Sequence, residues 1–322
     1  MTEYQEKVNE VLEEAGKIVI GQKHLLHRLL IGLFTNGHIL LEGMPGLAKT
    51  LTVNTLAKIL NLNFHRIQFT PDLLPADLVG TMIYNQHKCE FEVKKGPVFA
   101  NIILADEINR SPAKVQSALL ECMQEKQVTI GEETFILDRP FLVLATQNPI
   151  EHEGTFPLPE AQIDRFMMKV FLNYPDKATE MQVMRKMSDM SFNYTPKKIL
   201  NKADIFAIKD IINKITISET LENYILELIF ATREPESYGL SDIKDYILFG
   251  ASPRATINLH LAARANAFLN KRDYVLPEDI KDVAHDVLNH RIILNYEAEA
   301  DGISSRQIVD SILRKVNITN IR

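Results

Sequence analysis

The sequence has few cysteines, no long apolar run and no excess of positive charge. Its two cysteines, Cys89 and Cys122, show no spacing typical of a metal site, and we expect both to be structural thiols in a reducing, cytoplasmic compartment. No apolar run reaches the length that spans a membrane. The first residues are polar and acidic, so we expect no secretory signal.

The charge balance is acidic, with 36 Lys and Arg against 42 Asp and Glu and a formal net charge of −6. This balance argues against nucleic acid as the main partner, although a local basic patch could lie within it. Hydrophobic residues make up 46% of the 322 residues and charged residues 24%, which is typical of globular chains with a sizeable core. This length predicts one large or two ordinary domains.

The most informative stretch is a glycine-bearing turn at residues 43–50 (GMPGLAKT). It follows an apolar run at 38–41, which predicts a strand, and precedes a helical run at 51–60. Between a strand and a helix, the backbone N–H groups of such a turn cradle phosphates. The sequence therefore predicts a nucleotide-binding turn made of Gly43, Met44, Pro45, Gly46, Leu47, Ala48, Lys49, Thr50 and Leu51.

Two side chains of this turn carry specific roles in the prediction. Lys49 neutralises phosphate oxygens, and the hydroxyl of Thr50 binds Mg²⁺. The strict pattern has Gly before the lysine, whereas this chain has Ala48. Alanine keeps its N–H donor and is the best helix former, so we expect it to be tolerated where the helix begins.

A second motif is the apolar run 102–105 followed by Asp106 and Glu107. A continuous apolar run is typical of a strand buried on both faces of a parallel sheet, and ligands bind at the carboxyl end of such strands. We expect Asp106 to bind Mg²⁺, mostly through water, and Glu107 to activate the attacking water. The pattern taken alone also fits a solvated acidic turn.

A buried strand at 141–146 ends in the same way, close to Asn148, which we expect to contact a phosphate oxygen and a water. A capping asparagine before Pro149 is the alternative. Upstream, Val19 and Ile20 lie in a short apolar run that precedes a helix beginning at Lys23. Either this run packs on the adenine ring of the nucleotide, or it is an ordinary helix N-terminus.

Two arginines are candidates for stabilising transferring phosphoryl charge. Arg165 ends a short helix entered through Pro159, and it matters if a neighbouring subunit places its ATP there. Arg254 lies in the first turn of a helix capped by Ser252, where the helix dipole disfavours a cation. In both cases an ordinary exposed charge is the alternative.

The remaining segments predict two hairpins and the division of the chain into domains. Two hairpins are expected, near 82–93 and near 128–137, and the helix that precedes the second is expected to begin at a Ser111 cap. After residue 175 the strand pattern gives way to helical periodicity. We therefore predict an αβα nucleotide-binding domain at 1–180 and an all-helical domain at 181–322.

These motifs resemble the MoxR family of AAA+ ATPases. The resemblance rests on residues 43–50, 104–110 and 145–149, and above all on 153–166 (EGTFPLPEAQIDRF). Residues 251–254 match the sensor 2 motif of the family. Alanine is also the residue that the family usually carries before the lysine of the turn, as Ala48 does here. His152 departs from the pattern, since Gln is commoner there.

The resemblance implies a P-loop αβα domain followed by a helical lid. It implies that Asp106 and Glu107 are the Walker B acids, Asn148 sensor 1, Arg165 the arginine finger and Arg254 sensor 2. The two hairpins become the helix-2 insert and the pre-sensor-1 hairpin. Members of the family form rings, commonly hexamers, and act as chaperones on protein clients, often with von Willebrand factor A domain partners.

Three functions are compatible with these motifs. The first is a ring-forming, Mg-dependent ATPase that remodels a protein client. The second is a motor or loader on nucleic acid, for which Lys88, Lys94 and Lys95 are the local basic candidates, although Glu90 and Glu92 interleave with them. The third is a nucleotide-dependent scaffold with negligible turnover, which the full set of acid, sensor and finger candidates disfavours.

Overall fold

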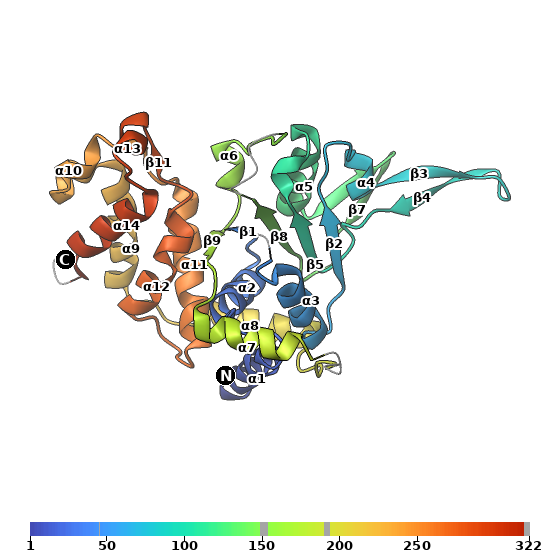
Figure 1. Cartoon of the computed structure of the whole chain (residues 1–322), viewed down its shortest axis with the longest axis horizontal. Coiled ribbons are helices and arrows are strands. Elements are labelled where there is room, and N and C mark those ends of the chain that lie inside the picture. Colours follow the sequence, from blue (N-terminus) through green and yellow to red (C-terminus); the bar gives the residue numbers. More distant parts are fainter. Residues whose placement is uncertain (45, 149–153, 190–193, 319–322) are drawn as a thin grey trace. The chain divides into compact units, whose positions relative to one another are not determined.

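The computed structural model describes residues 1–44, 46–148, 154–189 and 194–318 (Figure 1). The chain forms two compact units. The first unit contains Glu6–Leu158 and Val170–Phe206, and the second contains Met1–Gln5, Pro159–Lys169 and Ala207–Arg322. The domain boundary that we expect at residue 180 stays a prediction. Among the helices of the described ranges, none combines the length and apolar character that a membrane crossing requires.

A five-stranded sheet with the order β2-β5-β8-β1-β9 forms the core of the first unit. Its strands are β1 (Ile39–Gly43), β2 (Phe64–Gln68), β5 (Ile102–Asp106), β8 (Leu142–Gln147) and β9 (Met168–Leu172). β1 and β5 each pair with β8 in parallel, and β2 pairs with β5 in parallel. The apolar runs of β1, β5 and β8 are buried, as a sheet covered on both faces requires. The predicted parallel α/β fold is confirmed.

Helices cover both faces of this sheet (Figure 1). The helix α3 (Lys49–Ile59), which follows the turn, lies on one face, and α4 (Pro75–Val79) and α5 (Ala113–Glu125) lie on the other. The other helices that lie wholly within the unit are α2 (Lys23–Thr35), the 3-10 turn η1 (Ile108–Arg110) and α7 (Lys177–Met187), whereas α1 (Thr2–Gly16) and α8 (Lys202–Asn213) each extend across a boundary between the two units. The helix that we expect to begin at Lys23 is confirmed by α2.

His38 connects the sheet to α5. The backbone N–H of Val143 donates to His38 Nδ1 at 3.0 Å, so Nε2 carries the proton and donates to the carbonyl of Met123 at 3.1 Å. The bond accepted at Nδ1 requires the neutral imidazole, because a protonated Nδ1 cannot accept. Burial, which disfavours the charged form, lowers the pKa of His38 to about 4.

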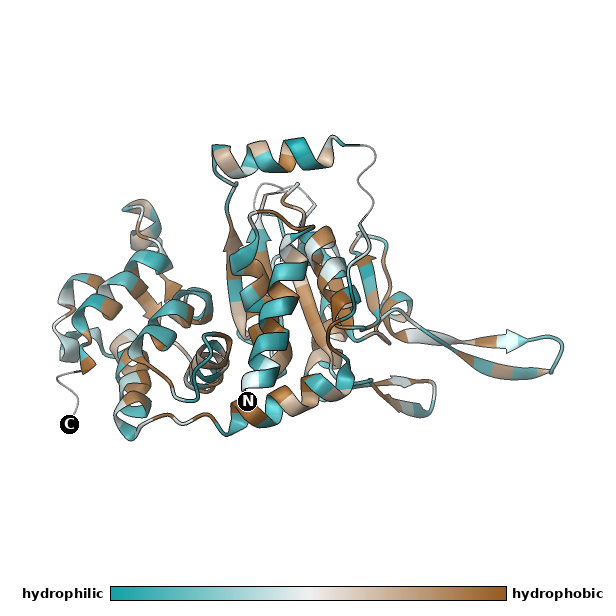
Figure 2. Ribbon diagram, turned by 90° about the horizontal axis from the view of Figure 1, so that it is seen from below, coloured by the Kyte–Doolittle hydropathy of each residue, from teal (hydrophilic) through white to brown (hydrophobic). Residues whose placement is uncertain are grey.

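Two antiparallel hairpins leave this unit, as expected. The longer pairs β3 (Gly80–Asn85) with β4 (Glu90–Lys95), and the shorter pairs β6 (Gln127–Ile130) with β7 (Glu133–Ile136). The longer hairpin projects well beyond the sheet, with apolar and polar residues alternating along it (Figure 2). Its exposed apolar residues are Met82, Ile83, Tyr84 and Phe91.

The bases of the two hairpins touch each other. The ammonium of Lys95, at the end of β4, lies 4.9 Å from the ring centre of Phe99 and 5.0 Å from that of Phe135 on β7. Gly80 has φ +108°, and a Cβ there would lie 2.3 Å from the Lys94 carbonyl oxygen. Glycine is therefore required where β3 begins, because any side chain would collide with the partner strand.

The second unit is mostly helical. Its elements are α6 (Glu160–Ile163), α9 (Glu219–Arg233), the 3-10 turn η2 (Pro235–Tyr238), α10 (Ser241–Lys244), α11 (Pro253–Leu269), α12 (Pro277–Leu288), α13 (Tyr296–Ala300) and α14 (Ser305–Lys315). The residues of α9 that recur at helical spacing are buried, namely Leu221, Tyr224, Ile225, Leu228 and Ile229.

Two details of the sequence prediction are wrong. The helical unit also contains a short antiparallel pair, β10 (Ile247–Phe249) with β11 (Ile293–Leu294), and strands this short show no readable alternation. The helix α5 begins at Ala113 with Pro112 as its N-cap, so Ser111 does not cap it. The hydroxyl of Ser111 instead donates to the carbonyl of Ile108. The predicted Ser252 cap of α11 is confirmed, since its side chain accepts from the N–H of Arg254.

Candidate functional site

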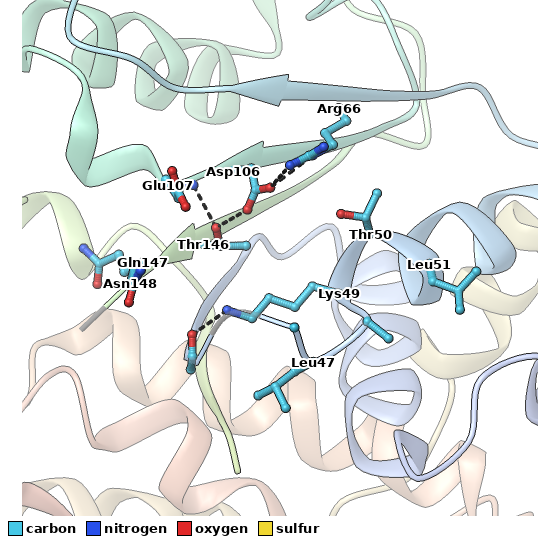
Figure 3. Close-up of a pocket in the computed structure, with 13 residues that line it drawn as sticks. Leu47, Lys49, Thr50, Leu51, Arg66, Asp106, Glu107, Thr146, Gln147 and Asn148 are labelled. Atoms are coloured by element: carbon cyan, nitrogen blue, oxygen red, sulfur yellow. Dashed lines mark hydrogen bonds and ion pairs between the residues drawn. The ribbon is translucent and has the colours of Figure 1, made fainter. Parts of the chain in front are cut away.

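The turn between β1 and α3 forms one wall of a pocket with a volume of about 480 Å³ (Figure 3). The opposite wall comes from the carboxyl ends of β5 and β8. The residues that line the pocket are Gly43, Gly46, Leu47, Ala48, Lys49, Thr50, Leu51, Arg66, Asp106, Glu107, Thr146, Gln147 and Asn148. The fold thus brings together ten of the residues that the sequence predicts, from three separate segments.

Ala48 adopts a conformation that the sequence did not suggest. It is the N-cap of α3, with φ +54° and ψ +26°, in the left-handed region. This region costs an L-residue roughly 1 kcal/mol, so the argument that alanine suits this place as a helix former is wrong. The residue is not helical here, and glycine would meet less strain. Gly46 also has a positive φ of +84°.

Lys49 begins α3 and turns back toward β1. Its ammonium donates to the carbonyl oxygen of Gly43 at 2.7 Å. Among the described residues this is its one hydrogen-bond acceptor, which leaves two of its three donors for phosphate oxygens. Partial burial lowers the pKa of Lys49, while the carboxylates of Asp106, Glu107 and Glu42 act in the opposite direction.

Thr146 on β8 fixes both acids at the end of β5 (Figure 3). Its buried hydroxyl donates to Asp106 Oδ1 at 2.7 Å and accepts from the backbone N–H of Glu107 at 2.8 Å. Glu107 has φ +58°, again in the left-handed region. Such strain persists only where the surroundings hold it, and it is concentrated at functional sites. The sequence prediction did not include Thr146.

The neighbouring strand β2 supplies two further side chains that the sequence prediction missed. Arg66 donates to Asp106 Oδ2 through Nε at 3.0 Å and through a terminal nitrogen at 2.6 Å. Gln68 donates to Glu107 Oε2 at 2.8 Å. Arg110 also contacts Glu107 Oε2, at 3.2 Å. The available signal was the i, i+2 spacing of Arg66 and Gln68, which places them on one face at the end of a strand.

Some predicted residues do not line this pocket. Met44 and the pair Val19 and Ile20 are absent from its walls, and Val19 is buried in the core. Their contact with a nucleotide stays a prediction. The segment is tied to the turn, however, because Gln22 Nε2 donates to the carbonyl of Leu47 at 3.2 Å. Pro45 and His152 lie outside the described residues.

Arg165 and Arg254 belong to the second unit, where both lie next to Asp164. The hydroxyl of Ser252 lies 3.0 Å from both carboxylate oxygens of Asp164 and shares its single proton between them. A terminal nitrogen of Arg254 lies 3.5 Å from the same carboxylate. Asp164 also pairs with Arg291, whose Nε lies 2.8 Å from Oδ1. The finger and sensor 2 roles of these two arginines stay predictions.

Comparison with known proteins identifies the family. The ATPase family associated with various cellular activities (AAA) matches residues 38–168, and the AAA lid domain matches residues 240–312. "Chaperone MoxR1" of Mycobacterium tuberculosis is 48% identical over 311 residues, which cover 96% of this chain and 81% of that protein. "Protein MoxR" of Methylorubrum extorquens is 30% identical over 98% of this chain and 95% of its own length. This chain belongs to the MoxR family of AAA+ ATPases.

Solved structures agree with this assignment. A crystal structure of a Cytophaga hutchinsonii protein superposes on the MoxR-family chain with a TM-score of 0.94 at 70% identity, covering 98% of this chain and 96% of that one. A full-length MCM homologue from Methanopyrus kandleri superposes with a TM-score of 0.59 at 18% identity, covering 91% of this chain and 62% of that one. At that identity the likeness shows the fold alone.

The pocket suits a nucleotide with a hard cation. The N-terminus of α3 offers backbone donors and the positive end of its dipole to phosphates. Asp106 offers the carboxylate oxygens that Mg²⁺ prefers, and Thr50 lies across the pocket at the start of α3 (Figure 3). The residues present therefore fit ATP and Mg²⁺.

Proposed function

We propose that this MoxR-family chain hydrolyses ATP in a Mg²⁺-dependent reaction and uses the energy to remodel protein clients. The observation that carries the proposal is the convergence of Lys49, Asp106 and Glu107 on one pocket from two strand ends. Because phosphoryl transfer depends on positioning and charge stabilisation, these are the groups that it requires.

Each side chain has a defined task in this proposal. Lys49 binds phosphate oxygens with the donors that Gly43 leaves open. Thr50 and Asp106 would hold Mg²⁺, which would supply charge neutralisation at the phosphates. Glu107 accepts a proton from the attacking water, and Asn148 orients that water or a phosphate oxygen. Thr146 positions both acids through its two hydrogen bonds.

We further propose a ring, commonly a hexamer in this family, in which active sites are shared. Arg165 acts on the nucleotide of a neighbouring subunit, and Arg254 acts on the nucleotide of its own. The Mycobacterium tuberculosis relative is named a chaperone, which supports a protein client. Partners with von Willebrand factor A domains and a cytoplasmic location complete the proposal.

The test is steady-state ATPase activity with Mg²⁺ as a function of protein concentration. Specific activity should rise with concentration as subunits assemble. Glu107→Gln should bind ATP and lose most turnover, and Arg165→Ala should bind ATP without hydrolysing it. Mixing Arg165→Ala with Lys49→Ala should restore part of the activity, because each variant supplies what the other lacks.

Two outcomes would count against parts of this scheme. Normal turnover by Glu107→Gln would remove the role of that carboxylate. Activity that depends on neither concentration nor Arg165, in a range where the mass stays monomeric, would remove the shared site and leave only the pocket around Lys49.

The nucleic-acid alternative has weaker support from the longer hairpin. Lys88 forms an ion pair with Glu92 at 2.6 Å, and Lys95 lies against two aromatic rings. Two of its three basic candidates are thus engaged within the chain. ATPase activity stimulated by DNA or RNA in a salt-dependent way would nevertheless favour that function.

A further inference from the structure

Arg66 and Thr146 together engage both oxygens of the Asp106 carboxylate. Thr146 Oγ1 donates to Oδ1 at 2.7 Å, and two nitrogens of the Arg66 guanidinium donate to Oδ2 at 3.0 and 2.6 Å (Figure 3). The second contact joins a full positive charge to the carboxylate. Asp106 is therefore already neutralised by a cation of the chain itself.

This position conflicts with the metal role of the same carboxylate. Mg²⁺ is held by few protein oxygens and keeps several waters, which also need space beside the carboxylate. A guanidinium within 3 Å of Oδ2 takes that space and repels the metal ion. Arg66 and Mg²⁺ thus cannot occupy the same oxygen of Asp106 together.

The side chain of Arg66 can leave this position at small energetic cost. It lies on β2, which is the edge strand of the sheet, and its side chain is 48% exposed. Its other bond goes to Gln68 Oε1 at 2.8 Å, on the same strand face. Exposed ion pairs hold weakly, because water competes for both partners. A long, exposed side chain can therefore exchange a carboxylate for solvent at small cost.

We infer that Arg66 is the resident counter-cation of Asp106 in the nucleotide-free chain, and that the magnesium nucleotide binds by displacing it. This inference rests on the proposed function, since it takes Asp106 as a magnesium group. Its consequence is that Arg66 raises the Mg²⁺ concentration at which the pocket accepts nucleotide. The chain then stays unloaded when free Mg²⁺ is low.

The experiment measures binding instead of turnover. A fluorescent, non-hydrolysable ATP analogue is held at fixed concentration while Mg²⁺ is titrated, and the midpoint is compared between the wild-type chain and Arg66→Gln. We expect the midpoint to fall at least threefold in Arg66→Gln. Arg110→Gln is the matched control, because it removes an exposed arginine that contacts Glu107 instead, and its midpoint should move less than twofold.

An unchanged midpoint in Arg66→Gln overturns the inference. A raised midpoint, with weaker binding at saturating Mg²⁺, also overturns it and makes Arg66 a phosphate ligand. The proposed function is checked in the same experiment by Lys49→Ala, which should abolish binding. If the wild-type chain binds no nucleotide, the proposed function fails and takes this inference with it, whereas binding with equal midpoints defeats the inference alone.

Discussion

The guanidinium of Arg291 lies 2.8 Å from the carboxylate of Asp164, and the arginine side chain is fully buried. Arg291 also donates to the carbonyls of Phe166 and Asp164, at 2.6 and 3.1 Å. Burial lowers the pKa of Arg291 to about 10, and the Asp164 carboxylate opposes this shift. The ion pair therefore holds the segment that carries Arg165 against the turn that follows α12.

We expect Asp164→Asn to destabilise the second unit by about 3 kcal/mol, because it leaves a buried guanidinium without its counter-charge. The measurement is urea unfolding of the full chain. Arg254→Ala is the control: it removes a partner that is 46% exposed at 3.5 Å from the same carboxylate. Its loss should stay below about 1 kcal/mol. Equal losses of unfolding free energy in the two variants would mean that the burial of Arg291 does not determine the contribution of this ion pair to stability.

Thr146→Val should lower ATPase turnover strongly while leaving the strand in place. Valine has the shape of threonine but lacks the hydroxyl that joins Asp106 to the N–H of Glu107. Leaving these groups without their partner costs about 1–3 kcal/mol, which corresponds to roughly 5-fold to 150-fold in turnover if it falls on the reacting geometry. Thr146→Ser keeps the hydroxyl and should retain most activity. Similar kcat values for the two variants would show that the hydroxyl is dispensable.

Stability should fall as the pH drops below about 6.5, partly because of His38. Its folded-state pKa of about 4 lies below the ordinary histidine pKa of about 6.5, so the unfolded chain binds the proton first. Between pH 7 and pH 5 this group alone should remove about 2 kcal/mol of the unfolding free energy. The check is the difference in that pH slope between the wild-type chain and His38→Gln, which cannot titrate. Parallel slopes would contradict a neutral buried imidazole.

Ala48 should tolerate glycine but reject a β-branched residue. Ala48→Gly keeps the N–H and relieves the left-handed strain, which offsets the greater freedom of glycine in the unfolded chain. Its stability should therefore stay within about 1 kcal/mol of the wild type, with nucleotide binding retained. Ala48→Val should weaken both stability and binding, because β-branched residues rarely adopt this conformation. Normal binding by the valine variant would argue against the left-handed turn.

The sequence predicted those parts of the site that depend on local pattern. The turn that carries Lys49 and the acids after the apolar run at 102–105 are read from contiguous residues. Arg66 and Gln68 were missed because their role depends on β2 lying beside β5, and the order of strands in a sheet is not written in any one segment.

Two other errors have local causes, and a third has a long-range one. The left-handed backbone of Ala48 is imposed by the turn, against the helix preference of alanine. Ser111 is a good cap in isolation, but its hydroxyl is taken by the carbonyl of Ile108, one turn back. The β10–β11 pair joins residues more than forty positions apart through strands of three and two residues. No window of the sequence contains both partners of such a pair.

The contact of Lys95 with Phe99 and Phe135 joins the base of the longer hairpin to the shorter hairpin. The longer hairpin projects from the sheet, and its base packs against the shorter hairpin, which directly follows α5. The other end of α5 follows Glu107 and the short turn η1. The carboxylate of Glu107 is thus connected through η1 and α5 to the base of both hairpins, and we expect a displacement of Glu107 to be largest at the tip of the longer hairpin.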